Sequence, residues 1–274
     1  MTALPPFPLI VDFAALIALV PASVLPFRDR AASRGGSWAI QGVALAGALV
    51  LVAWRVSVSW DSGLATALWL SIGATLIAYA WFAVLRRPIA GLLPLLAPYL
   101  LIVATLATIL DIDLPPGAPA VGRALPELWV ALHIVVSLST YALVTLAALA
   151  GLAVILREHS LKAKREPGFV AILPPMREAE SLQFRALVAA EIVLGLGIVS
   201  GMVLEVAAVG TAIVFDHKTV LSLIAFVVLG VLLISHAKAG LRGRRASRFA
   251  LAAYLLITLA YPGVKAVHQI LITG

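Results

Sequence analysis

The sequence contains no cysteine and little charge. Charged residues make up 12% of its 274 residues, whereas soluble domains carry about 25%. The absence of cysteine excludes disulfides, thiol relays and covalent haem attachment through a Cys-x-x-Cys-His motif of this chain. Residues 1–132 also contain no histidine, so any imidazole chemistry belongs to the second half. Because 62% of the residues are hydrophobic, we predict an all-α, polytopic integral membrane protein.

Eight apolar runs approach the length of about 20 residues that a bilayer core requires. They predict eight transmembrane helices in a single transmembrane domain over residues 1–274. The first run lacks a cationic leader and a small-residue cleavage site, so we expect it to be a retained span. Pro262 and Gly263 interrupt the last run, and we expect a break there. The runs lie near residues 7–26, 38–56, 64–85, 91–110, 129–156, 184–209, 218–237 and 249–270.

The loops between these runs alternate in charge. The first, third, fifth and seventh loops are rich in arginine and lysine, and the even-numbered loops carry acidic residues. By the positive-inside rule the odd loops are cytoplasmic, and both termini are external. The net charge of +7 therefore reflects membrane topology, and we expect no nucleic-acid partner. The prediction is a multi-pass membrane protein.

Five histidines are the first candidates for function, because ionisable side chains in a membrane cost a few kcal/mol and usually mark a ligand or a proton path. The topology places His133 and His268 near the external ends of their spans, where two neutral imidazoles can ligate one haem iron. His236 lies at the cytoplasmic end of its span, about one bilayer thickness away, and needs a different haem or a different role. The remaining two are His159 and His217.

Each histidine also has a structural alternative. Histidines at helix ends can sit at the headgroup interface or interact with the last carbonyls of a helix. For His133 the alternative is a hydrogen bond inside the bundle to a neighbour such as Ser137. Among the other intramembrane polar residues, Glu205 and Lys265 can meet a haem propionate or pair with each other. Glu191 is a candidate proton-relay group or the partner in a bundle-internal hydrogen bond.

Two segments carry a family resemblance. HIVVSLSTY, from His133 to Tyr141, resembles the histidine-containing helix of the cytochrome c assembly family, which includes CcsA, CcmC and CcmF. FDHKTVLSLIAFVVLGVLLISHAKAGLRGRR, from Phe215 to Arg245, is similar to the family's WDPKE block and its LHxR ending. The HAKAGLRGRR tail and the AYPGVK element are most similar to the small eight-span branch of YpjD and HemX type. The likeness covers a core of residues 129–270.

The resemblance implies non-covalently bound haem b. In this reading His133 is the outer ligand of the haem iron, His236 is the inner transmembrane histidine, and His268 is a second outer ligand. Asp216 and His217 occupy the haem-presenting block, with His217 where the family has proline. The tryptophan-rich haem-presenting motif of the larger family members is absent from this sequence.

Together these features predict a membrane haem-binding protein that handles or presents haem across, or at the outer face of, the inner membrane. We expect it to act as an accessory rather than as an enzyme. Its expected partners are the lipid bilayer, haem and other cytochrome c assembly proteins. Two alternatives remain open: a small-solute permease that uses Glu191, Glu205 and Lys265, and a non-catalytic scaffold that regulates tetrapyrrole synthesis.

Overall fold

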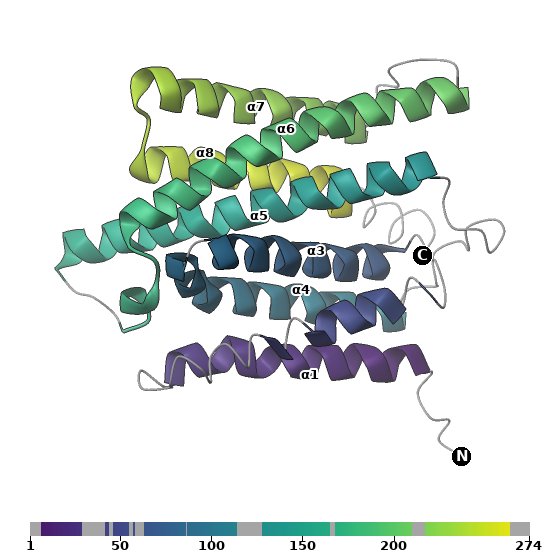
Figure 1. Cartoon of the computed structure of the whole chain (residues 1–274), viewed down its shortest axis with the longest axis horizontal. Coiled ribbons are helices and arrows are strands. Elements are labelled where there is room, and N and C mark those ends of the chain that lie inside the picture. The colour runs from purple at the N-terminus through teal and green to yellow at the C-terminus, as the bar shows by residue number, and fades with distance from the viewer. Residues whose placement is uncertain are drawn as a thin grey trace. The chain divides into compact units, whose positions relative to one another are not determined.

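The structure is a computed structural model that describes residues 7–28, 42–43, 46–54, 57, 63–85, 87–113, 128–164, 168–209 and 217–263. Within these ranges the regular elements are all helical, as expected (Figure 1). Three short helices are η1 (Arg87–Leu92), η2 (Val170–Ile172) and the π-helix η3 (Leu259–Gly263). The long helices are α1 (Phe7–Arg28), α3 (Leu64–Leu85), α4 (Leu93–Asp113), α5 (Leu128–Ala163), α6 (Met176–Val209), α7 (His217–Ala239) and α8 (Gly243–Thr258).

Five of the described helices are long and apolar enough to cross a membrane, so the chain is a polytopic membrane protein. The expected spans 64–85, 91–110 and 218–237 correspond to α3, α4 and α7 within a few residues. The expected runs near 38–56 and 249–270 lie partly outside the described residues. The five apolar segments are Leu64–Leu85, Leu93–Leu110, Leu128–Ala163, Met176–Val206 and Thr219–Ala239.

The connection between α5 and α6 is shorter than the sequence predicted. We expected a loop from Arg157 to Gln183, but α5 continues to Ala163 and α6 begins at Met176. His159 is therefore an exposed residue of α5 and not a loop residue. The helices extend past the apolar runs because arginine, glutamate, lysine and glutamine are good helix formers, and water solvates their side chains.

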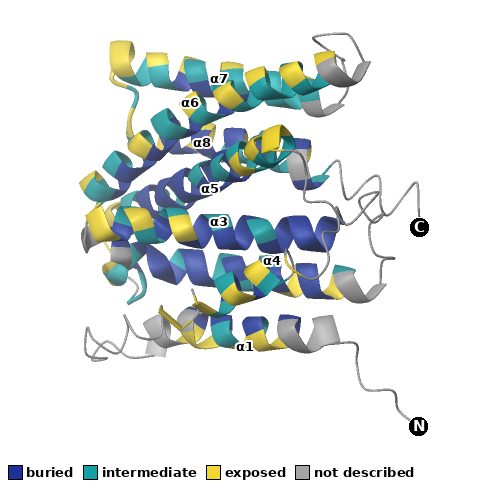
Figure 2. Ribbon diagram, turned by 45° about the vertical axis from the view of Figure 1, so that its right-hand side comes forward, coloured by how far each residue is buried: buried dark blue, intermediate teal, exposed yellow. Residues whose placement is uncertain are grey.

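The chain forms two compact units. The first comprises residues 1–77, 93–125 and 265–274, and α1 packs on α4 within it. The second comprises residues 78–92 and 126–264, and it contains α5 to α8. In the second unit α5 packs against α6 and α8, and α7 packs against α6 and α8. Most of the apolar window of α5 is buried (78%), against 17% in α6 and in α7 (Figure 2).

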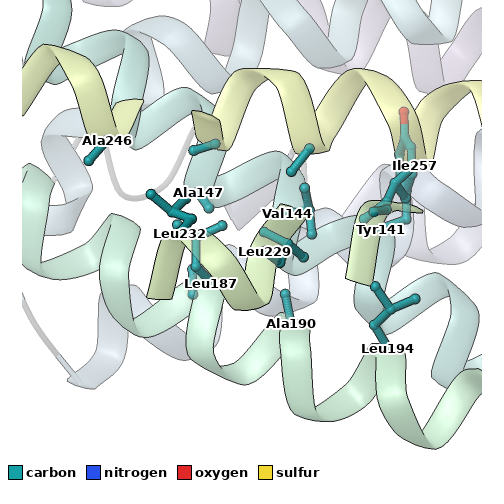
Figure 3. Close-up of a cluster of buried hydrophobic side chains, with 14 residues drawn as sticks. Tyr141, Val144, Ala147, Leu187, Ala190, Leu194, Leu229, Leu232, Ala246 and Ile257 are labelled. Atoms are coloured by element: carbon teal, nitrogen blue, oxygen red, sulfur yellow. The ribbon is translucent and has the colours of Figure 1, made fainter. Parts of the chain in front are cut away.

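Small residues explain the central position of α5. The segment YALVTLAALAGLAV, residues 141–154, alternates alanine and glycine with larger apolar residues, which lets neighbouring helices approach closely. A cluster of buried side chains joins α5 to α6, α7 and α8 (Figure 3). Its members include Tyr141, Val144, Ala147, Leu187, Ala190, Leu194, Leu229, Leu232, Ala246 and Ile257.

Helices α5, α6 and α8 approach one another closely around Gly151. Gln183 of α6 and Ser247 of α8 are both buried, and the Ser247 hydroxyl donates a hydrogen bond to Gln183 Oε1 at 3.2 Å. A Cβ atom at Gly151 would lie 3.2 Å from Gln183 Nε2 and 3.2 Å from the Ser247 Cβ. An alanine here would require these neighbours to shift by a few tenths of an ångström.

The turn between α7 and α8, and the end of α8, follow sequence signals. Gly240 and Gly243 have positive φ angles of 63° and 62°, which glycine adopts without strain. Glu180 Oε1 accepts a hydrogen bond from the Gly243 backbone N–H at 2.9 Å and so ties α8 to α6. We expected a break at Pro262–Gly263; α8 ends at Thr258, but the chain continues directly as the π-helix η3, which contains Pro262, and the residues after Gly263 lie outside the described ones.

Candidate functional site

His133 lies between α5 and α6, near the start of α5. Its Nδ1 atom is 2.8 Å from the hydroxyl oxygen of Ser200 on α6, so its partner is Ser200 and not the expected Ser137. The Ser200 hydroxyl also donates to the Gly197 carbonyl oxygen at 3.0 Å. A Cβ atom at Gly201 would lie 3.3 Å from the His133 Cε1. The imidazole therefore packs against a glycine surface of α6 and is held through one ring nitrogen.

His236 lies in the last turn of α7 and is held in a similar way. Its Nδ1 is 2.7 Å from the carbonyl oxygen of Leu241. Because a carbonyl only accepts, Nδ1 carries the proton, and Nε2 of the neutral ring is unprotonated. The Phe184 ring of α6 stacks on the imidazole with centroids 4.2 Å apart and planes at 25°. Leu241 lies in the turn between α7 and α8, so this bond differs from the expected alternative of a bond to the last carbonyls of a helix. It leaves Nε2 without the proton.

A small cavity adjoins His236 at the junction of α6, α7 and α8. Its volume is about 20 Å³, and Gln183, Phe184, His236 and Arg242 are among its lining residues. This volume accommodates about one water molecule, which is far less than a porphyrin needs. Gln183 Nε2 is buried without a hydrogen-bond partner in the described part of the chain.

The two described candidate ligands contact α6 at positions far apart along this helix. His133 contacts α6 at Ser200, and His236 contacts it at Phe184. The 16 positions from 184 to 200 correspond to about 24 Å along a helix. One iron atom cannot bind both imidazoles, because its two axial ligands lie within a few ångströms of each other.

The other expected ligands are only partly covered. His268 and Asp216 lie outside the described residues, so the meeting of His133 and His268 stays a prediction. His217 is the first residue of α7, and its side chain is likewise outside the description. Among the described residues no three His, Asp or Glu side chains gather into a metal site. Axial ligation of haem needs only one or two imidazoles.

Glu191 lies on α6 between the two histidine contacts. Its Oε2 is buried and has no hydrogen-bond partner among the described residues, so the bundle-internal hydrogen bond expected for this atom is not found. The other oxygen, Oε1, packs against Gly230 of α7, where a Cβ atom would lie 3.2 Å away. The glycine provides the space that the carboxyl group occupies.

Sequence reasoning missed the residues that hold the two imidazoles. Ser200 is 67 positions from His133, and Phe184 is 52 positions from His236. The spacing of Gly197 and Gly201 was the available signal, because residues four apart share a helix face. It indicated close packing but not which side chain packs there.

Comparison with known proteins finds a matching protein family and similar membrane proteins. Residues 42–272 match the protein family described as cytochrome C assembly protein. The chain is 42% identical over 270 residues to an uncharacterized 28.8 kDa protein in the nifR3-like 5' region of Azospirillum brasilense, covering 96% of this chain and 98% of that protein. It is 32% identical over 139 residues to the inner membrane protein YpjD of Escherichia coli K12, covering 51% and 52% of the two chains. No solved structure matches.

Proposed function

Because this chain belongs to the cytochrome c assembly protein family, we propose that it binds haem b non-covalently and handles or presents it at the outer face of the bacterial inner membrane. The proposal includes eight spans with both termini external, as the loop charges predict. The naming of the E. coli relative as an inner membrane protein supports the location. The protein would act as an accessory alongside other cytochrome c assembly proteins and not as an enzyme.

The observation that carries this proposal is the state of His133. Its imidazole lies within a membrane helix, Nδ1 is engaged by Ser200, and Nε2 makes no hydrogen bond to the described residues. A neutral imidazole with one free ring nitrogen is the donor that haem iron accepts as an axial ligand. Bound haem supplies an iron with two axial positions, and we propose His268 for the second.

The next candidates along the chain are Asp216 and His217. They follow the end of α6, which is the end that carries Ser200 and hence His133. We propose that they contact the haem held by His133. Asp216 and His217 are thus assigned to the outer site, together with His133 and His268.

His236 is proposed as a contact for haem at the cytoplasmic side. Its Nε2 is available for iron, but the adjoining cavity holds only about one water molecule. The cavity itself is therefore too small to hold haem, and we propose that the outer site is the one that retains it.

The test is haem binding by the purified protein in detergent. The wild type, supplemented with haem, should give a b-type pyridine haemochrome and a low-spin spectrum. His133→Ala should lose the low-spin spectrum, whereas His236→Ala should keep it and load haem more slowly. His159→Ala is the matched control, because His159 is an exposed histidine of the same helix α5. Absence of haem in the wild type, or loss of the spectrum only in His236→Ala, would contradict the proposal.

One observation favours a second function. Glu191 places a buried carboxylate oxygen without a partner inside the membrane, which is typical of coupling residues in transporters. A small-solute permease would use this group with Glu205 and Lys265. In that case the purified protein would bind no haem, and Glu191→Gln would abolish proton-coupled uptake into proteoliposomes while His133→Ala would not.

A further inference from the structure

We propose that Ser200 and Gly201 of α6 are positioning residues for His133. The Ser200 oxygen accepts a hydrogen bond from Nδ1–H, which keeps the proton on Nδ1 and leaves Nε2 unprotonated. Gly201 provides the space in which the ring takes this orientation. The consequence for haem rests on the proposed function, but the state of the ring itself does not.

The direction of the hydrogen bonds follows from counting donors and acceptors. The Ser200 hydroxyl has one hydrogen, and the Gly197 carbonyl 3.0 Å away can only accept it. The Ser200 oxygen then accepts from His133 Nδ1–H at 2.8 Å, and both hydrogen bonds form. The reverse arrangement, with the hydroxyl donating to Nδ1, loses the bond to Gly197. It also puts a proton on Nε2, for which the described residues offer no acceptor.

The membrane interior makes this difference large. A buried polar group without a partner costs more where no water can replace the lost bond. The chain His133 Nδ1–H to Ser200 Oγ–H to the Gly197 carbonyl is therefore the favoured arrangement. It gives the outer histidine the same tautomer that the Leu241 carbonyl gives to His236.

Gly201 controls the angle of the ring. A Cβ atom there would lie 3.3 Å from His133 Cε1, which stands between the two ring nitrogens, and 4.0 Å from each nitrogen. A methyl group would push Cε1 away from α6 and turn both nitrogens. At Gly197, one turn earlier, a Cβ atom would meet only Val136 Cγ1 at an ordinary 3.5 Å. Of these two glycines, only Gly201 would crowd the ring.

Positioning of this kind affects an axial ligand in two ways. A hydrogen-bonded N–H fixes the tautomer and raises the basicity of the opposite nitrogen. Loss of such a partner typically lowers metal affinity about 10–100-fold. We therefore expect Ser200→Ala to weaken haem binding by about that factor and to shift the haem reduction potential. Ser200→Thr keeps the hydroxyl and should restore both.

The decisive experiment needs no haem. Magnetic resonance of isotope-labelled histidine in the haem-free, full-length protein in nanodiscs distinguishes the two tautomers, and the signal missing from His133→Ala assigns His133. We expect the wild type to carry the proton on Nδ1, Ser200→Ala to carry it partly on Nε2, and Ser200→Thr to resemble the wild type. Two results would overturn the proposal. The first is a proton on Nε2 of His133 in the wild type, a result that does not depend on whether a variant folds. The second is a Ser200→Ala variant with the same tautomer as the wild type.

Haem titrations form the second arm. Ser200→Ala and Gly201→Ala should weaken haem binding. Ser139→Ala, which removes an α5 hydroxyl that donates to the Val135 carbonyl, is the matched control and should leave binding unchanged. If the wild type binds no haem but Ser200→Ala shows the expected change of tautomer, the proposed function fails and the positioning role stands. If haem binds but Ser200→Ala changes neither the tautomer nor the affinity, the positioning role is wrong and the function stands.

Discussion

Replacing Gly151 by alanine should destabilise the protein, because this glycine sets the distance between α5, α6 and α8. In a helix interior the change from glycine to alanine by itself stabilises by about 0.5–1 kcal/mol. Against this gain, the new methyl group would stand 3.2 Å from both Gln183 Nε2 and the Ser247 Cβ. Methyl groups forced into a packed core cost about 1–3 kcal/mol.

A second cost comes from the hydrogen bond beside Gly151. Relief of the overlap moves Gln183 away from Ser247, and their 3.2 Å hydrogen bond is weakened. Such bonds between membrane helices contribute about 0.6 kcal/mol on average. The net expectation for Gly151→Ala is a loss of about 1–2 kcal/mol in the free energy of unfolding.

The assay is reversible unfolding in mixed micelles, followed by circular dichroism while the fraction of denaturing detergent is raised. Gly197→Ala is the control, since its methyl group meets a neighbour at 3.5 Å and should be neutral or stabilising. Gln183→Ala in the Gly151→Ala background should recover part of the loss by removing one of the two contacts. If Gly151→Ala unfolds at the same point as Gly197→Ala, the close three-helix contact is wrong.

Two further changes test other contacts. Gly230→Ala should destabilise the wild type but not a Glu191→Ala background, because the added Cβ atom would lie 3.2 Å from Glu191 Oε1. The coupling free energy in a double-mutant unfolding cycle should be about 0.5–3 kcal/mol, and additive effects would refute the contact. Arg157→Ala should speed protease cleavage within residues 164–175 without lowering the global unfolding free energy. The reason is that Arg157 donates to the carbonyls of Ala171 and Leu173 in that segment. Unchanged cleavage would show that these bonds do not hold the segment.

Much of the helix inventory followed from hydropathy alone. The runs predicted near 64–85, 91–110 and 218–237 agree with α3, α4 and α7 because a bilayer core demands a fixed length of apolar helix. Near Pro262, which lacks the N–H that an α-helix uses, the α-helix gives way to the π-helix η3 rather than ending. The end of α5 and the start of α6 were not predictable from hydropathy, because the charged turns that flank an apolar run are themselves good helix formers.

For the candidate site, the sequence singled out His133 and His236 because ionisable residues in apolar helices are rare. It did not give their partners, which depend on the rotation and depth of two helices relative to each other. The bond from His133 to Ser200 and the stack of Phe184 on His236 are contacts between residues far apart in the chain. Only the packed bundle brings these residues together.

Hydropathy also could not rank the helices by burial. The apolar windows of α5, α6 and α7 have mean hydropathies of 2.1, 2.3 and 2.6, yet 78%, 17% and 17% of them are buried. Lipid tails are as apolar as a neighbouring helix, so composition determines which segments enter the membrane and not which faces meet. Small residues placed at the contacts, such as Gly151 and Gly201, decide how closely the helices pack. The sequence by itself therefore determined the membrane helices and the candidate ligands, and the tertiary structure alone decided what holds each imidazole.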